Sequence, residues 1–261
     1  MARICPLFSG STGNCTYISS HGGAILVDVG GSYKATVNAL ERIGACIDDI
    51  KAVAVTHEHT DHIKGLKTFL KNTSLPLIGS NETLETLANT DKIPSDTKLI
   101  VADAPIEVGG FEIHRFATRH DCEGSSGYTV TLPDGQRTAV CTDLGVMTEE
   151  VRNALYGCST VLIESNHDID MLKRGPYPAV LKLRILSDNG HLSNNACAVE
   201  LPRLLQKGTT RFILGHISRN NNLPTLALSA AKATLTEAGA VRDCDYILTA
   251  AKPDGNEVTV F

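Results

Sequence analysis

The sequence contains no apolar run that approaches the length of a bilayer-spanning helix, so no membrane partner is expected. No apolar signal-peptide region follows its first five residues. The eight cysteines are scattered and include no Cys-x-x-Cys pair. Without an export signal, reduced thiols in a cytoplasmic protein are the expected state.

An excess of basic residues is also missing. The 24 Lys and Arg against 29 Asp and Glu give a formal net charge of −5, which provides no overall attraction to nucleic acid. A local basic groove is compatible with this balance. With 261 residues, of which 42% are hydrophobic and 20% charged, the chain has the composition of a globular protein with a sizeable core.

The glycine-serine loop at residues 9–14 lacks the spacing of a nucleotide-binding motif. Neither a Lys-Ser/Thr pair nor a predicted helix follows it, so a plain turn is expected there and not a phosphate cradle.

Three histidines and an aspartate are concentrated within six residues, directly after the apolar segment 51–55. His57 and His59 are separated by one residue and can face one cation, whereas Asp61 and His62 can face a second. Nitrogen and oxygen ligands without a thiolate suit zinc, with manganese or iron as poorer alternatives. Because the whole chain has only nine histidines, this concentration predicts a metal site. Helical spacing of apolar residues predicts a helix at 63–71 immediately afterwards.

Other polar residues also follow predicted strands. His120, Asp143 and His216 come after apolar or alternating segments, as His57 does. We therefore expect all of them at one edge of the β-structure, where separate strands can supply ligands to one centre.

Asp28 ends the apolar strand predicted at 25–27, where a carboxylate needs a hydrogen bond or a nearby cation. It can orient a metal-bound histidine or cap the helix predicted at 32–42. Ser193 is the expected N-cap of a helix at 195–206, which Pro202 is expected to kink. The pattern as a whole predicts an α/β fold, with two facing sheets, helices on the outer faces and metals at one rim.

The chain resembles the metallo-β-lactamase fold superfamily, whose signature His-x-His-x-Asp-His matches residues 57–62. Over nearly its whole length it resembles the YycJ/WalJ-type branch of bacterial DNA exonucleases. The segments that carry this narrower resemblance are residues 9–14, 56–62, 190–194, 214–218 and 220–222. The resemblance implies one hydrolase domain over residues 1–261, folded as a four-layer αββα sandwich of two mixed sheets.

By resemblance, two divalent metal ions would be held by seven residues. The first ion would bind His57, His59 and His120, the second would bind Asp61, His62 and His216, and Asp143 would bridge them. His191 would contact a phosphate or donate a proton, and Asp61 would orient the attacking water. The residues expected to support these ligands or contact substrate are Asp28, Glu164, His167, Ser193 and Asn194.

The expected function is that of a metal-dependent phosphodiesterase, specifically a 5′-3′ exonuclease-like nuclease acting on DNA. Basic residues expected to contact phosphates are Lys64, Lys67, Lys173, Arg174, Lys182, Arg184 and Arg219. The alternatives are a small-molecule hydrolase of the same fold, which cleaves a cyclic phosphodiester, lactam or thioester, and a non-catalytic metal-binding protein.

Overall fold

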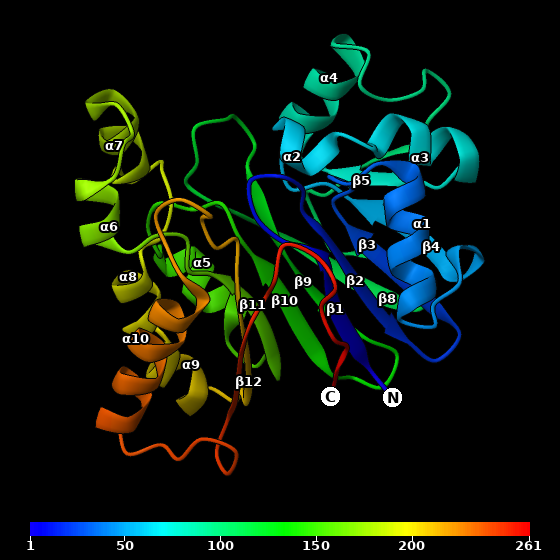
Figure 1. Ribbon diagram of the computed structural model, residues 1–261. Coiled ribbons are helices and arrows are strands. Elements are labelled where there is room, and N and C mark those ends of the chain that lie inside the picture. The colour runs from blue at the N-terminus through cyan, green and yellow to red at the C-terminus, as the bar shows by residue number, and fades with distance from the viewer.

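The apolar segments form two facing seven-stranded β-sheets in the computed structural model, which describes residues 1–261 (Figure 1). The first sheet has the strand order β14 (Thr259–Val260), β1 (Arg3–Phe8), β2 (Cys15–Ser20), β3 (Gly23–Val27), β4 (Ile50–Ala54), β5 (Leu77–Gly79) and β6 (Leu99–Val101). The second has the order β13 (Ile247–Ala250), β12 (Arg211–Gly215), β11 (Thr160–Glu164), β10 (Arg137–Cys141), β9 (Ser126–Thr131), β8 (Phe111–Ala117) and β7 (Ile106–Val108).

Helices cover the outer face of each sheet (Figure 1). Those beside the first sheet are α1 (Tyr33–Arg42), α2 (Thr60–Ile63), α3 (Leu66–Thr73) and α4 (Asn81–Asn89), with a 3-10 turn, η1, at Ile47–Asp49. Those beside the second are α5 (Glu149–Leu155), α6 (Ile169–Arg174), α7 (Ala179–Ile185), α8 (Asn194–Ala198), α9 (Leu201–Gln206) and α10 (Pro224–Glu237). The predicted α/β four-layer αββα sandwich is confirmed.

The strands next to the site are parallel and buried on both faces. In β3, Ile25 faces the other sheet whereas Leu26 packs under the helices, because successive side chains point to opposite faces. This double burial explains why β3 and β4 read as continuous apolar runs. Strands β3 to β6 run parallel, as do β10 to β13, so each set directs its carboxyl ends to one edge.

Two predicted helices are interrupted in the structure. The helix expected at 63–71 is divided into α2 and α3 at Gly65, where a Cβ would lie 1.8 Å from the carbonyl oxygen of Gly31. The helix expected at 195–206 is divided into α8 and α9, with Pro202 in the first turn of α9. A proline fits there because a first-turn N–H has no partner within the helix. Helices α6 and α7 were not predicted. No helix is both long and apolar enough to cross a membrane.

Tyr128 joins the two sheets beside the metal-binding segment. Its side chain, on β9, is fully buried, and its hydroxyl donates a 2.6 Å hydrogen bond to the carbonyl oxygen of Val55, just after β4. This bond satisfies a backbone acceptor that water cannot reach.

We expect Tyr128→Phe to lower the free energy of unfolding by about 1–3 kcal/mol, because the buried Val55 carbonyl would lose its partner. Urea unfolding monitored by circular dichroism measures this change. Tyr33→Phe is the control, since Tyr33 is only half-buried and packs against Phe69. Equal stability of the two variants would contradict this role.

Candidate metal centre

Both sheets direct polar residues to the same rim, and the backbone turns sharply where they do so. Asp28 follows β3, Asp143 follows β10 and His216 follows β12, with φ angles of 63°, 59° and 52°. These are left-handed conformations, which Asp and His adopt more readily than most residues but which are still strained. Each turn brings a side chain from a buried strand end to the rim.

Three imidazole rings form the first group. The ring centroids of His57 and His59 are 4.6 Å apart, and each lies 5.1 Å from that of His120. His120 Nδ1 lies 3.0 Å from the carbonyl oxygen of Gly190, which accepts its hydrogen bond and leaves Nε2 as the metal-facing atom. His57 Nε2 is buried and has no hydrogen-bond partner. These three residues are the predicted first ligand set.

Asp61, His62 and His216 form the second group. One ligand atom from each lies within 4.8 Å of the others. Asp61 Oδ2 is 3.6 Å from His62 Nε2 and 3.8 Å from His216 Nε2. His216 Nε2 is buried without a hydrogen-bond partner, as expected for an atom whose function is to bind a cation.

Asp143 lies between the two groups. Its Oδ1 is 3.9 Å from His120 Nε2, and its Oδ2 is 3.3 Å from His62 Nε2. The side chain is buried, and Oδ2 has no hydrogen-bond partner. The unpartnered buried atoms of His57, Asp143 and His216 are all metal-ligand types, so the residues present fit divalent cations.

Asp28 supports His62 from behind. Its Oδ2 accepts a hydrogen bond from His62 Nδ1 at 2.7 Å and one from the Thr56 hydroxyl at 2.9 Å, while Oδ1 accepts from the Thr56 amide at 2.8 Å. The predicted helix at 32–42 is capped by Ser32 instead. Asp28 therefore fixes which nitrogen of His62 faces the centre, as carboxylates behind metal-bound histidines do.

Buried charge sets the protonation of the metal-free site. Burial lowers the pKa of His57 well below its usual value, so this imidazole is neutral and able to bind metal. Burial also opposes charge on His62, but Asp143 and Asp28 outweigh it and raise the pKa of His62 to about 10. Without metal, a proton on His62 therefore balances the carboxylates, and a divalent cation can replace it.

Glu164, at the end of β11, holds two histidines at once. Its Oε1 accepts from His216 Nδ1 at 2.7 Å and from His191 Nδ1 at 3.0 Å. Its Oε2 accepts the amides of Leu144 and Leu192 at 3.2 and 2.9 Å. Burial raises the pKa of this carboxyl, but His191 and His216 outweigh that effect and lower it to about 2. Sequence reasoning placed Glu164 near the site but did not identify this double contact.

The loop after β1, which we expected to be a plain turn, also supports the site. Asn14 Nδ2 lies 3.2 Å from Asp61 Oδ2 and 3.0 Å from His62 Nε2, and the Ser9 hydroxyl accepts the His216 amide at 2.9 Å. The loop also packs against the segment after β3, since the carbonyl oxygen of Asn14 accepts the Gly30 amide at 2.7 Å. The spacing of glycines alone gave no signal for this role.

The remaining predicted residues are Ser193, Asn194 and His167. Ser193 caps α8, and the buried Asn194 side chain bonds to Ser165 and Asn222. His167 is buried, neither ring nitrogen has a hydrogen-bond partner, and burial lowers its pKa to about 4. No hydrogen bond connects these three side chains to the seven predicted ligands.

Asp121 was not predicted from the sequence, yet it borders the first group. Its Oδ1 lies 3.2 Å from His120 Nε2 and 3.6 Å from His59 Nε2, and its other oxygen pairs with Arg184 on α7. Of the other predicted phosphate contacts, Lys67 forms an ion pair with Asp91.

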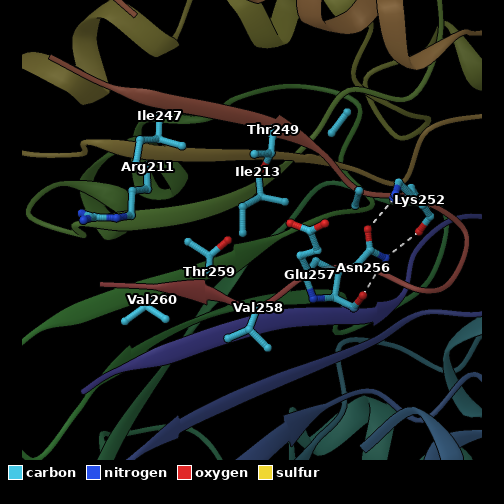
Figure 2. A pocket seen from close by; sticks show the side chains of 13 residues that line it. Arg211, Ile213, Ile247, Thr249, Lys252, Asn256, Glu257, Val258, Thr259 and Val260 are labelled. Atoms are coloured by element: carbon cyan, nitrogen blue, oxygen red, sulfur yellow. Dashed lines mark hydrogen bonds between the residues drawn. The ribbon is translucent and has the colours of Figure 1, made fainter. Parts of the chain in front are cut away.

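A pocket of about 240 Å³ opens onto these groups. It is lined by Ser11, His59, Asp61, Asp143, Asn166, Tyr177, Leu181, Arg184, Ile185, His191, His216 and Ser218. Figure 2 shows a second cavity of about 430 Å³ between β12, β13 and β14, which shares no residue with the first. Its lining includes Arg211, which lies at the opposite end of β12 from His216. None of its lining residues is a predicted ligand.

A model of the beta-lactamase superfamily domain matches residues 24–217, which include all seven predicted ligands. The chain belongs to this superfamily. The exodeoxyribonuclease YycJ of Bacillus anthracis is 34% identical over 235 residues, which cover 89% of each chain. The exodeoxyribonuclease WalJ of Streptococcus pneumoniae is 32% identical over 252 residues, 95% of this chain and 93% of that one. The predicted superfamily and its YycJ/WalJ-type branch are thus confirmed.

A solved structure with the same fold is the metallo-β-lactamase fold protein YhfI of Bacillus subtilis. It is 15% identical, with a TM-score of 0.71, and the alignment covers all of both chains. At this identity the likeness establishes the fold alone.

We expect Asp28→Asn to lower zinc affinity by about 10- to 100-fold, because the carboxylate that orients His62 is lost. Asparagine also tolerates a positive φ, so the backbone turn is kept. Competition with a chromophoric chelator measures the affinity. Asp91→Asn is the matched control, since Asp91 has a φ of 56° at an exposed position. Unchanged zinc affinity in Asp28→Asn would contradict its orienting role.

Proposed function

We propose that this chain is a metal-dependent phosphodiesterase that degrades DNA from an end, with the 5′-3′ direction expected from the YycJ/WalJ-type resemblance. The observation that carries the proposal is the two-group ligand set with Asp143 between the groups and His191 beside them. This arrangement suits hydrolysis of a phosphodiester, and the two relatives named exodeoxyribonucleases support DNA as the substrate. The proposal treats residues 1–261 as one domain in the cytoplasm, with all eight thiols free.

Two divalent ions would be held by the seven ligands, with zinc as the first choice and manganese or iron as alternatives. His57, His59 and His120 would hold one, Asp61, His62 and His216 the other, and Asp143 would contact both. When bound, such a pair lowers the pKa of a water molecule toward neutrality and balances negative charge on a phosphate.

Asp61 and His191 would orient the attacking water and donate a proton to the leaving group. Asp61 Oδ2 faces His62 and His216, which leaves Oδ1 to accept a hydrogen bond from the attacking water. His191 Nδ1 is fixed by Glu164 at 3.0 Å, so Nε2 is the atom that can donate a proton to the leaving 3′ oxygen. Because His191 lines the pocket and is partly exposed, a substrate can reach it.

The proposed activity is tested by incubating metal-loaded protein with end-labelled single- and double-stranded DNA. A generic phosphodiester and a cephalosporin serve as parallel substrates. We expect release of nucleotides from the DNA end, with DNA binding that weakens steeply as salt rises. Hydrolysis of the cephalosporin or the generic phosphodiester without cleavage of DNA would favour the small-molecule alternative. No hydrolysis by the metal-loaded protein would contradict both.

We expect His191→Ala to lower the rate of DNA cleavage by about 10²- to 10⁴-fold, the usual contribution of a general acid. Hydrolysis of a p-nitrophenyl phosphodiester should fall much less, since that leaving group needs no proton. Metal content, measured by atomic absorption, should stay unchanged. Asp143→Asn should lower both activities and the metal content. An equal loss on both substrates with His191→Ala would contradict the acid role.

A further inference from the structure

Helices α6 and α7 form an arm beside the second sheet, defined here as residues 169–187. They lie toward the upper end of the view in Figure 1, above α8 and α10, whereas the two chain termini lie at its lower end. Neither helix belongs to a predicted ligand segment. The arm combines basic side chains with exposed large aliphatic ones.

The arm is basic within an acidic chain. Residues 169–187 contain one acidic side chain, Asp170, and four basic ones, whereas the whole sequence has a net charge of −5. The four are Lys173, Arg174, Lys182 and Arg184, of which Arg184 is paired with Asp121. Such a segment attracts a polyanion locally, although the protein as a whole does not.

The arm also exposes large aliphatic side chains. Val180 is 80% exposed, Leu183 is 68% exposed and Leu186 is 41% exposed. Val180 and Leu183 are three residues apart on α7 and therefore lie on the same side of the helix. A group of exposed aliphatic residues beside a pocket indicates a surface that binds an apolar partner.

This surface is continuous with the candidate metal centre. Tyr177, Leu181, Arg184 and Ile185 line the same pocket as Asp143 and His191, and the Ile185 carbonyl accepts the His191 amide at 3.0 Å. The Tyr177 hydroxyl accepts from Asn220 at 2.9 Å, which anchors the middle of the arm. The arm is thus fixed to the residue proposed as the proton donor.

We propose that the arm binds the end of a DNA strand, with its basic side chains on phosphates and Val180 and Leu183 against the faces of unstacked terminal bases. This inference rests on the proposed nuclease function and specifies that the bound part of the DNA is a strand end with unstacked bases. A base has an apolar face, but inside a duplex stacking covers it, so a protein can reach it only at an end or in a single strand. Positive charge together with exposed aliphatic residues matches such an end better than the phosphate surface of an intact duplex.

The test compares wild type with the double variant Val180→Ser/Leu183→Ser on DNA carrying 2-aminopurine as its 5′-terminal base. With wild type, binding should raise the fluorescence as the base leaves its stack. The double variant should give no such rise and should bind the end about tenfold more weakly, because aliphatic burial is lost. Both positions are exposed, so the fold should be retained. Val241→Ser, at a site 57% exposed outside the arm, is the matched control.

Hydrolysis of a p-nitrophenyl phosphodiester separates the two proposals. The double variant should hydrolyse this small substrate at the wild-type rate, since Val180 and Leu183 are absent from the pocket lining.

The charge on the arm is tested with Lys173→Gln, which should reduce the slope of log affinity against log salt by about one. The arm proposal is overturned if the double variant binds and degrades DNA ends as wild type does. If wild type degrades no DNA but cleaves the small ester, the substrate assignment itself fails.

Discussion

Buried negative charge is the constraint on which the rest of this structure depends. The carboxylates of Asp28, Asp143 and Glu164 all lie at the metal centre, and each of these residues is no more than 2% exposed. Ionised carboxylates in such surroundings are strongly unfavourable unless they are hydrogen-bonded and paired. Asp28 accepts a hydrogen bond from His62 Nδ1, and Glu164 accepts one from His216 Nδ1. Asp143 lies between these two histidines.

The fold meets this constraint by arranging strand ends. The parallel strands β3 and β4 in one sheet and β10 to β12 in the other end at the same rim, where loops carry the ligands. Positive φ angles at Asp28, Asp143 and His216 turn these residues off their strands at a cost of about 1–3 kcal/mol each, and the hydrogen bonds around them keep them there. The backbone of Gly30, after β3, lies close against the carbonyl oxygen of Asp61 and so helps to hold the metal-binding segment in place.

Much of this arrangement could be predicted from the sequence, because its signals are local. The density of histidines in residues 57–62 and the polar residues after apolar strands identified the seven residues that the structure brings together. The supporting shell was harder to predict, since Glu164 contacts histidines 27 and 52 residues away in the chain. Asp121 and Asn14 lie in polar loops whose composition fits ordinary turns equally well. Helices α6 and α7 are short and mostly exposed, so they lack the apolar periodicity that predicted the others.

The arm and the metal centre line the same pocket but differ in charge and exposure. The centre is largely buried and holds carboxylates among its histidines, whereas the adjoining arm carries basic and exposed aliphatic side chains. Since His191 is bonded both to Glu164 at the centre and to Ile185 of the arm, substrate binding and proton donation would share one element. The basic side chains of the arm would attract a polyanion locally, although the chain has no overall positive charge.

The most direct measurement is anomalous diffraction from crystals grown with zinc. We expect two anomalous peaks, one bordered by His57, His59 and His120 and the other by Asp61, His62 and His216, with Asp143 touching both. A single peak confined to residues 57–62, or none at this rim, would contradict it.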